Sequence, residues 1–531
     1  FGLVGGLALV SAAWAQIDQR LPDLGDGSSL SVQQERRLGE SIMRQLWRDP
    51  EVMDDPVLTA YVQAIWTALR ASAKDLGNLS AELDESYAWD LLLVRDRTVN
   101  AFALPGGYMG VHLGLIAVVS NRDELAAVLG HELSHVTQRH IARMQDSQAK
   151  QTPWLVGSFL LGVLAASRSP DAANALIMGG TASVAQGQLN FSRDMEREAD
   201  RLGFSVTTHA GFEAQGMVSM FQKLAQASRL NDSGGFPYLR THPLTTERIG
   251  DMQARMGAQS ASTQSQPGTL EHALMSARAR ALMSTRAEEI EGLIHTYQQD
   301  APRETNRLRL ASMAYAAAMA FAQQRNDAQA ADVVTKLRSW VQGDARAERS
   351  VRWLAADLQR RAGQPKACVD TLMASDNERP EVLLKAQCQL ALNDATQTRA
   401  LVQRLQFWLA QHPRDALAWE WIAQAYAQNR DAQSQIELCR VAEPPRQELL
   451  RHLLDQYGPG RVIFRNTRAA IPGFPRRDYH PVPLAPDAPP VLLDRIAREF
   501  HAEETGAAGS IRYAFRDDPR LLWLAGFLLE V

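Results

Sequence analysis

Two histidines and a glutamate, in the segment from His131 to His135 (HELSH), have the residue types and spacing for metal chemistry. On an α-helix, residues four apart share a face, so His131 and His135 can converge on one ion with Glu132 beside them. Histidine nitrogens suit Zn²⁺, and a catalytic zinc needs a third protein ligand and an open position for water. Glu132 would take a proton from the activated water and deliver it to the leaving amine. The segment therefore predicts peptide-bond hydrolysis.

Alone, this five-residue motif also fits an amphipathic helix with two surface histidines, but a second acidic segment lies downstream. Glu196 and Asp200 are again four residues apart on a predicted helix and share a face. Glu196 can complete a site of two histidines and one carboxylate, and Asp200 can accept a hydrogen bond from the distal ring nitrogen of a ligand histidine. Glu198 is the rival ligand, but it faces roughly the opposite side of that helix.

Three further histidines are expected to be structural rather than metal-bound. His140 follows His135 by five residues and, on one continuous helix, would be rotated away from the ligand face. His112 falls in a strand pattern, and His209 lies near a predicted helix end. None of the three is assigned to the metal site.

The helices that must carry the ligands have clear start signals and apolar periodicity. One is predicted to open at Asn121, which has the capping-box spacing with Glu124, and to run through both histidines to about Met144. Another is expected from about Arg193 to Ala210, and a third from Ala214 to Ser228. Both predicted ligand segments therefore lie on helices.

Upstream of these helices, the sequence predicts a small sheet flanked by helices. Helical periodicity covers about Val32 to Leu69, and short apolar or alternating runs at Trp89–Val94 and Ala101–Ile116 are typical of strands. Pro105-Gly106-Gly107 favours a tight turn, so the second run is expected to form a hairpin.

The chain is predicted to be mainly α-helical with several parts, because 531 residues exceed the size at which single cores stop growing. The predicted parts are an export signal at 1–15, a zincin-type metalloprotease domain with a small β-sheet at 16–256, a Ser/Gln/Gly-rich linker at 257–268, tetratricopeptide-like helical repeats at 269–442, and a Pro/Arg-rich tail at 443–531. A plain helical bundle is the alternative to a solenoid of repeats. The tail could be disordered, it could be a small separate module, or it could result from a reading-frame error in sequencing.

Export is inferred from the apolar, charge-free residues 1–15, which end in an A-x-A pattern; a transmembrane helix is the alternative. The apolar runs 154–166 and 172–184 are also too short to span a membrane, and 154–166 could be core or lie against a membrane surface. Of three cysteines, Cys368 and Cys388 could form one bridge or remain two buried thiols. A net charge of -4 and a hydrophobic fraction of 45% give no reason to expect nucleic-acid binding.

Three segments together resemble the exported metalloproteases of the Ste-type prenyl-protease family, also called minigluzincins. They are GHELSHVTQRH, the E-x-x-A-D pattern from Glu196 to Asp200, and NAFALPGGYMGVHLGLI. The similarity covers about residues 20–255 closely and the repeats only loosely. It is greatest to the periplasmic members that carry tetratricopeptide repeats. The resemblance implies one Zn²⁺ per subunit, with Glu196 as its third ligand.

The resemblance also implies roles for residues outside the ligand helices. Asn100, Ala101 and Phe102 would border the cleft and bind substrate as an added β-strand, although Asn100 could be an ordinary turn residue. His242 would occupy the open zinc position and keep the enzyme latent, unless it is a loop histidine without metal contact. Apart from the resemblance, Arg248 in the segment THPLTTERI could hydrogen-bond a substrate carbonyl or a tetrahedral intermediate, or it could be a helix-surface arginine.

Taken together, these features predict a periplasmic zinc endopeptidase acting on unfolded or misassembled proteins in outer-membrane protein quality control. The resemblance implies the outer-membrane β-barrel assembly machinery as a partner. A peripheral contact with a membrane is an alternative that the sequence leaves undecided. The alternative is a chaperone or adaptor that acts through the repeats while the metal site stays mostly latent.

Overall fold

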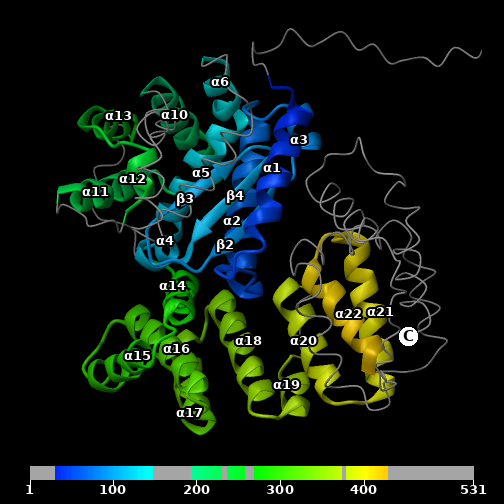
Figure 1. Ribbon diagram of the computed structural model, residues 1–531. Coiled ribbons are helices and arrows are strands. Elements are labelled where there is room, and N and C mark those ends of the chain that lie inside the picture. Colours follow the sequence, from blue (N-terminus) through cyan, green and yellow to red (C-terminus); the bar gives the residue numbers. More distant parts are fainter. Residues whose placement is uncertain (1–29, 148–192, 230–235, 257–267, 373–377, 429–531) are drawn as a thin grey trace, which may run out of the picture. The chain divides into compact units, whose positions relative to one another are not determined.

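The computed structural model describes residues 30–147, 193–229, 236–256, 268–372 and 378–428 (Figure 1). Several sequence predictions lie outside these residues: the export signal, the apolar runs 154–166 and 172–184, nearly all of the linker, and the tail from 443. Among the described helices, none combines the length and apolar character needed to cross a membrane.

The N-terminal periodicity corresponds to two main helices whose caps are encoded locally. Helix α1 (Val32–Leu46) begins at Ser31, which forms a capping box with Gln34. Strand β1 (Val52–Met53) precedes α2 (Pro56–Asp75), and α3 (Ala81–Ser86) follows it. Asp55 caps α2 by accepting a hydrogen bond from the backbone N–H of Leu58 at 2.9 Å.

The predicted small sheet is present, with four strands in the order β1-β2-β4-β3. Strands β3 (Ala101–Leu104) and β4 (Tyr108–His112) form the antiparallel hairpin that the Pro-Gly-Gly turn predicts. Gly106 and Gly107 both have positive φ in that turn, which favours glycine. Strand β2 (Asp90–Val94) pairs with β4 in parallel, so β3 is left at one end of the sheet.

The sheet is buried on both faces, and successive side chains of each strand point to opposite faces of the sheet. Leu91, Leu93 and Met109 belong to the main core with α2 and α5, whereas Leu92 and Leu104 pack with Ile42, Met43 and Leu46 of α1. This two-sided burial fixes the position of the β3–β4 hairpin.

After a short helix α4 (Leu113–Val118), helix α5 (Arg122–Thr137) carries the HELSH segment. Its N-cap Asn121 accepts a hydrogen bond from the N–H of Glu124 at 2.9 Å, as the capping-box spacing predicts. All residues of α5 from Glu124 to Thr137 are buried, so this is a central helix of the domain.

The prediction of one continuous helix to about Met144 is wrong. Helix α5 ends at Thr137, Arg139 has a positive φ of 52°, and a separate helix α6 (His140–Ser147) follows. The Arg139 side chain is held by two residues that are distant in sequence. It binds Glu35 at 2.7 Å and the carbonyl of Leu30. These tertiary contacts stabilise a backbone conformation that arginine rarely adopts.

Helix α10 (Arg193–His209) packs directly along α5, and both appear side by side in Figure 1. The approach is close enough to require glycine on both helices. A Cβ on Gly130 would lie 2.4 Å from Thr207 Oγ1, and one on Gly203 would lie 3.0 Å from the backbone of His131. Helices α11 (Gln215–Arg229), α12 (Tyr238–Thr241) and α13 (Thr246–Met256) complete this region.

The described residues from 268 onward form helices, in agreement with the mainly α prediction. They are α14 (Leu270–Met283), α15 (Ala287–Asp300), α16 (Arg307–Gln323), α17 (Asp327–Val341), α18 (Ala345–Arg361), α19 (Pro365–Thr371), α20 (Arg379–Ala391), α21 (Ala395–Gln411) and α22 (Ala416–Gln428). A disulfide joins Cys368 of α19 to Cys388 of α20, which resolves the choice between a bridge and two thiols. The solenoid of repeats remains a prediction.

Helix α14 packs against α4 and shares the main core with the sheet and α5. His272 contacts Tyr61 Oη through Nδ1 at 2.7 Å and the carbonyl of Val119 through Nε2 at 2.9 Å. Arg278 forms a buried two-point ion pair with Asp55, both contacts at 2.7 Å. The domain boundary predicted at 257–268 stays a prediction, and α14, the first helix after it, shares the core of the preceding residues.

Candidate metal centre

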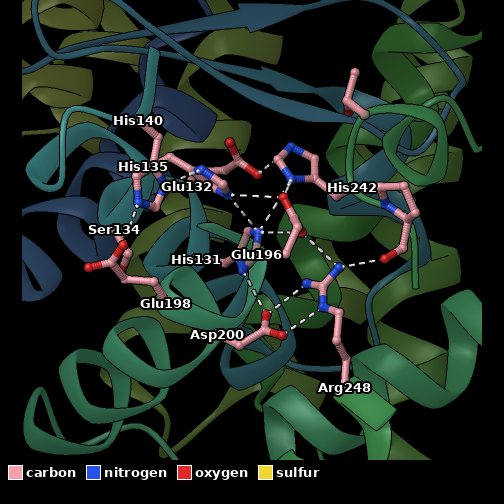
Figure 2. A network of polar contacts seen from close by, with 12 residues as sticks. His131, Glu132, Ser134, His135, His140, Glu196, Glu198, Asp200, His242 and Arg248 are labelled. Atoms are coloured by element: carbon pink, nitrogen blue, oxygen red, sulfur yellow. Dashed lines mark hydrogen bonds and ion pairs between the residues drawn. The ribbon is translucent and has the colours of Figure 1, made fainter. Parts of the chain in front are cut away.

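Four side chains from three parts of the chain converge beside α5: His131, His135, Glu196 and His242. One potential ligand atom from each lies within 4.8 Å of all the others. None of the four residues is more than 3% exposed. Figure 2 shows the two histidines of α5 facing Glu196 of α10, with His242 approaching from the segment after α12.

The distances within this cluster fit a small metal ion. The two Nε2 atoms of His131 and His135 are 3.0 Å apart, and they lie 3.5 Å and 3.4 Å from oxygens of Glu196. Zn–N bonds of about 2.0–2.1 Å in a tetrahedral site place neighbouring ligand atoms roughly 3.3 Å apart. The donor set of imidazole nitrogens and one carboxylate is also the set that zinc takes in proteins.

The orientation of His131 supports metal binding. Its Nδ1 lies 3.0 Å from Asp200 Oδ1, and an ionised carboxylate can only accept a hydrogen bond. Nδ1 can therefore keep a proton while Nε2, which points at the cluster, binds an ion. Although burial disfavours the charged imidazole, Asp200 and Glu196 raise the pKa of His131 to about 9, so an ion would displace a proton from Nε2.

Charge is concentrated here despite the burial. Burial opposes ionisation of Glu196, but His242, His131 and His135 together hold its pKa well below the usual range. Burial lowers the pKa of His135 well below its ordinary value, so this imidazole is neutral. A buried, ionised carboxylate beside imidazole nitrogens is suited to a cation.

His242, which follows α12, lies between Glu132 and the other three residues of the cluster. Its Nδ1 is 2.9 Å from Glu196 Oε1 and 3.4 Å from His131 Nε2, while its Nε2 is 3.3 Å from Glu132 Oε1. The ring of Tyr238 stacks on it with centroids 4.7 Å apart and an interplanar angle of 26°. The imidazole thus fills the space that a water molecule would need between Glu132 and an ion.

Arg248 is buried, so it is not a helix-surface residue. It binds Asp200 through Nε at 2.6 Å and Nη2 at 2.7 Å, and its Nη1 contacts Glu196 Oε2 at 2.7 Å. The same Nη1 donates to the carbonyl of Pro243 at 2.8 Å. All three guanidinium nitrogens are therefore engaged by the site and by the loop that carries His242 (Figure 2). These contacts raise the pKa of Arg248, although burial opposes its charge.

The predicted substrate-strand residues lie at the edge of the sheet. Ala101 and Phe102 belong to β3, which packs against α5, and the carbonyl of Asn100 accepts a hydrogen bond from the N–H of His112 at 3.0 Å. The Phe102 ring covers Gly110 and meets the His112 ring edge-on at 6.0 Å. The strand therefore runs beside the helix that carries the two histidines.

Two residues that the sequence reasoning set aside contact the site. His140 Nδ1 lies 2.8 Å from His135 Nδ1, and its Nε2 lies 3.1 Å from Glu198 Oε2. Burial lowers the pKa of His140 to about 4. The break between α5 and α6 makes this contact possible, and no glycine or proline there signalled the break. Tyr238 was missed as well.

The remaining histidines stand apart from the cluster, as expected. His112 contacts Thr98 Oγ1 at 2.9 Å, and His209 contacts Ser72 Oγ at 3.1 Å. Glu198 does not join the ligand cluster, whereas Glu196 does.

The chain is also similar in sequence to known proteins. The profile of peptidase family M48 matches residues 67–256. The beta-barrel assembly-enhancing protease of Escherichia coli is 34% identical over 248 residues, which cover 46% of this chain and 49% of that protein. A Yersinia pestis protein of the same name is 29% identical over 415 residues, covering 77% of this chain and 80% of the relative.

A more distant relative, the mitochondrial metalloendopeptidase OMA1 of Saccharomyces cerevisiae, is 27% identical over 226 residues, or 41% of this chain and 62% of that protein. The chain spans about half the length of the curated relatives that are at least 34% identical to it. The family resemblance read from the three sequence segments is confirmed.

Proposed function

We propose that this chain is a zinc-dependent endopeptidase, because the profile of peptidase family M48 matches residues 67–256. The observation that carries the proposal is the convergence of His131, His135 and Glu196, with Glu132 directly beside them. We assign the first three as zinc ligands and Glu132 as the general base.

When bound, zinc would supply Lewis-acid activation of water and of the scissile carbonyl. Glu132 would take the proton from the attacking water and then deliver it to the leaving amine. Asp200 holds His131 by its distal nitrogen, and Arg248 holds Asp200 in turn. These two residues keep the ligand face rigid while the proton moves.

We propose that substrate binds in an extended conformation along β3. This strand is at the end of the sheet and packs against α5, so a peptide added to its free edge would run past the metal cluster. Asn100 and, by alternation, Phe102 turn their main-chain groups toward β4, so the outer main-chain groups of Ala101 would supply affinity with little side-chain selectivity. Unfolded or misassembled proteins are the substrates that fit this mode.

The cellular setting is also proposed from the relatives. Two of them carry the name beta-barrel assembly-enhancing protease, which points to quality control of outer-membrane proteins in the periplasm. The β-barrel assembly machinery is then the expected partner of the helices that follow residue 268.

The described conformation is proposed to be latent. His242 joins the three ligands and separates them from Glu132, so a zinc ion held by all four would have no open position. The Tyr238 stack and the Arg248 contact to Pro243 hold the loop in this place. Displacement of the loop would expose Glu132 to water.

The same closure favours a second candidate function. Since the metal cluster is at most 3% exposed, the chain in this state could act as a chaperone or adaptor through its later helices. The two functions differ in whether proteolysis is required.

The test is the Glu132→Gln variant, prepared both alone and together with His242→Ala. Loss of a general base should lower the rate of casein cleavage by about 100-fold to 10,000-fold while the zinc content stays near one per chain. Glu82→Gln, at an exposed glutamate of α3, is the matched control and should cleave normally. Unchanged proteolysis in a zinc-loaded Glu132→Gln protein would refute the base assignment.

A further inference from the structure

We propose that Glu198 and His140 form a hydrogen-bond relay that fixes His135 in its metal-binding tautomer. The proposal rests on the zinc site proposed above and assigns a positioning role to two residues outside the ligand set. It explains why the buried His140 contacts the far side of His135 and why the partly buried Glu198 contacts His140.

The relay depends on the turn between α5 and α6. Arg139 adopts a left-handed conformation there, which reverses the expected direction of His140. The His140 ring then lies against His135, with centroids 4.8 Å apart and planes at 77°. Glu35 binds Arg139 at 2.7 Å and also accepts a hydrogen bond from Tyr87 Oη at 2.6 Å, so the turn is anchored to α1.

The donor and acceptor roles follow from the carboxylate end. Glu198 Oε2 is 2.9 Å from Arg143 Nη1, and this contact keeps the carboxylate ionised and able only to accept. His140 must therefore donate its Nε2–H to Glu198, across 3.1 Å. In a neutral imidazole, the lone pair is then on His140 Nδ1.

That lone pair decides the tautomer of the ligand. His140 Nδ1 faces His135 Nδ1 at 2.8 Å, so His135 must donate from Nδ1. The lone pair of His135 is consequently on Nε2, the atom 3.0 Å from His131 Nε2 and 3.4 Å from Glu196 Oε1. Every hydrogen bond of the relay points in one direction.

The opposite direction is chemically inconsistent. A proton on His140 Nδ1 alone would leave its Nε2 lone pair against the Glu198 carboxylate. It would also move the His135 proton to Nε2, where it would block the metal. The relay therefore excludes the tautomer that cannot bind an ion.

Helix α10 thus supplies three carboxylates with separate tasks. Glu196 joins the ligand cluster, and Asp200 contacts His131 Nδ1 directly at 3.0 Å. Glu198 faces away from the cluster and reaches His135 only through His140. Both α5 ligands are oriented from the same helix by different routes.

The experiment measures the zinc dissociation constant of the full chain by competition with a chromophoric chelator. Outer hydrogen bonds to metal ligands are worth about 10-fold to 100-fold in affinity, so His140→Leu should weaken zinc binding by that factor. His140→Asn keeps an acceptor for His135 Nδ1–H and should bind closer to the wild type than His140→Leu does.

Glu198→Gln keeps both imidazoles but weakens and can reverse the relay, so it should also lose affinity. In a His140→Leu background the same change should have no further effect, because the relay is already broken. Asp194→Asn is the matched control, since it removes one negative charge from the exposed first turn of α10 and should bind like the wild type.

Thermal melting of the metal-free proteins separates positioning from folding. A loss of zinc affinity in Glu198→Gln with an unchanged melting temperature supports the relay. Wild-type affinity in both Glu198→Gln and His140→Leu would overturn it. If the wild-type chain itself binds no zinc, the proposed function fails first, and the relay fails with it.

Discussion

Replacing Arg248 with methionine removes the guanidinium that neutralises two buried acids of the metal centre. Asp200 and Glu196 are 1% and 2% exposed, and Arg248 contacts them at 2.6–2.7 Å. Methionine fills similar space without charge, so the change isolates the electrostatic contribution.

The expected loss of stability is large in the metal-free protein. Removing one partner of a buried ion pair costs about 3–5 kcal/mol, because the remaining charge stays buried without compensation. For a cooperative unit of 150–250 residues, about 1 kcal/mol shifts the melting temperature by roughly 2–4 °C. The unfolding transition of this domain should therefore fall by roughly 6–20 °C.

Zinc should reduce that loss. A dication held by Glu196 replaces part of the missing positive charge, so the variant should lose less stability when zinc is bound. Calorimetry of wild type and Arg248→Met, each with and without zinc, measures both differences. Arg255→Met, at an exposed arginine of the same helix α13, controls for loss of a surface charge.

Two results would refute this reasoning. If Arg248→Met melts at the temperature of Arg255→Met, the buried ion pair does not stabilise the domain. If the loss is the same with and without zinc, the metal does not share the charge balance of Glu196 and Asp200.

Two further predictions concern the loop and the docking of α14. His242→Ala should cleave casein roughly 10-fold to 100-fold faster than the wild type, since the charge-assisted hydrogen bond to Glu196 alone is worth about 1.5–3 kcal/mol; an unchanged rate at equal zinc content would argue against latency. Burial lowers the pKa of His272, so at acidic pH the unfolded chain binds a proton that the folded chain excludes. The folded state therefore keeps its full stability above the unfolded pKa of about 6.5 and loses stability as the pH falls below that value. Melting between about pH 8 and pH 5 should decline more steeply in the wild type than in His272→Gln, and parallel declines would contradict this origin of the pH dependence.

The sequence could predict which side chains converge in the candidate metal centre because the pieces of that cluster are local. Spacings of four residues on two helices place His131 with His135, and Glu196 with Asp200, on shared faces. The capping of α5 by Asn121 and the Pro-Gly-Gly hairpin are likewise local, and the structure confirms both. What remained open was how the two helices meet, which depends on close packing at Gly130 and Gly203.

The end of α5 could not be predicted for the opposite reason. Gln138 and Arg139 are compatible with a continuing helix, and no local residue stops it. The turn is held by Glu35 and the carbonyl of Leu30, more than one hundred residues earlier in the chain. Only tertiary contacts of this kind could reveal that His140 returns to His135.

This dependence joins the N-terminal helix to the chemistry of the site. Glu35 holds Arg139, the Arg139 turn places His140, and His140 contacts the Nδ1 of His135. The first and last of these steps are buried or partly buried polar contacts, which are strong only while their partners stay in place. Helix α1 carries no ligand, yet its carboxylate supports the orientation of one. The metal centre is therefore specified by residues from α1 to α13, not by the HELSH segment alone.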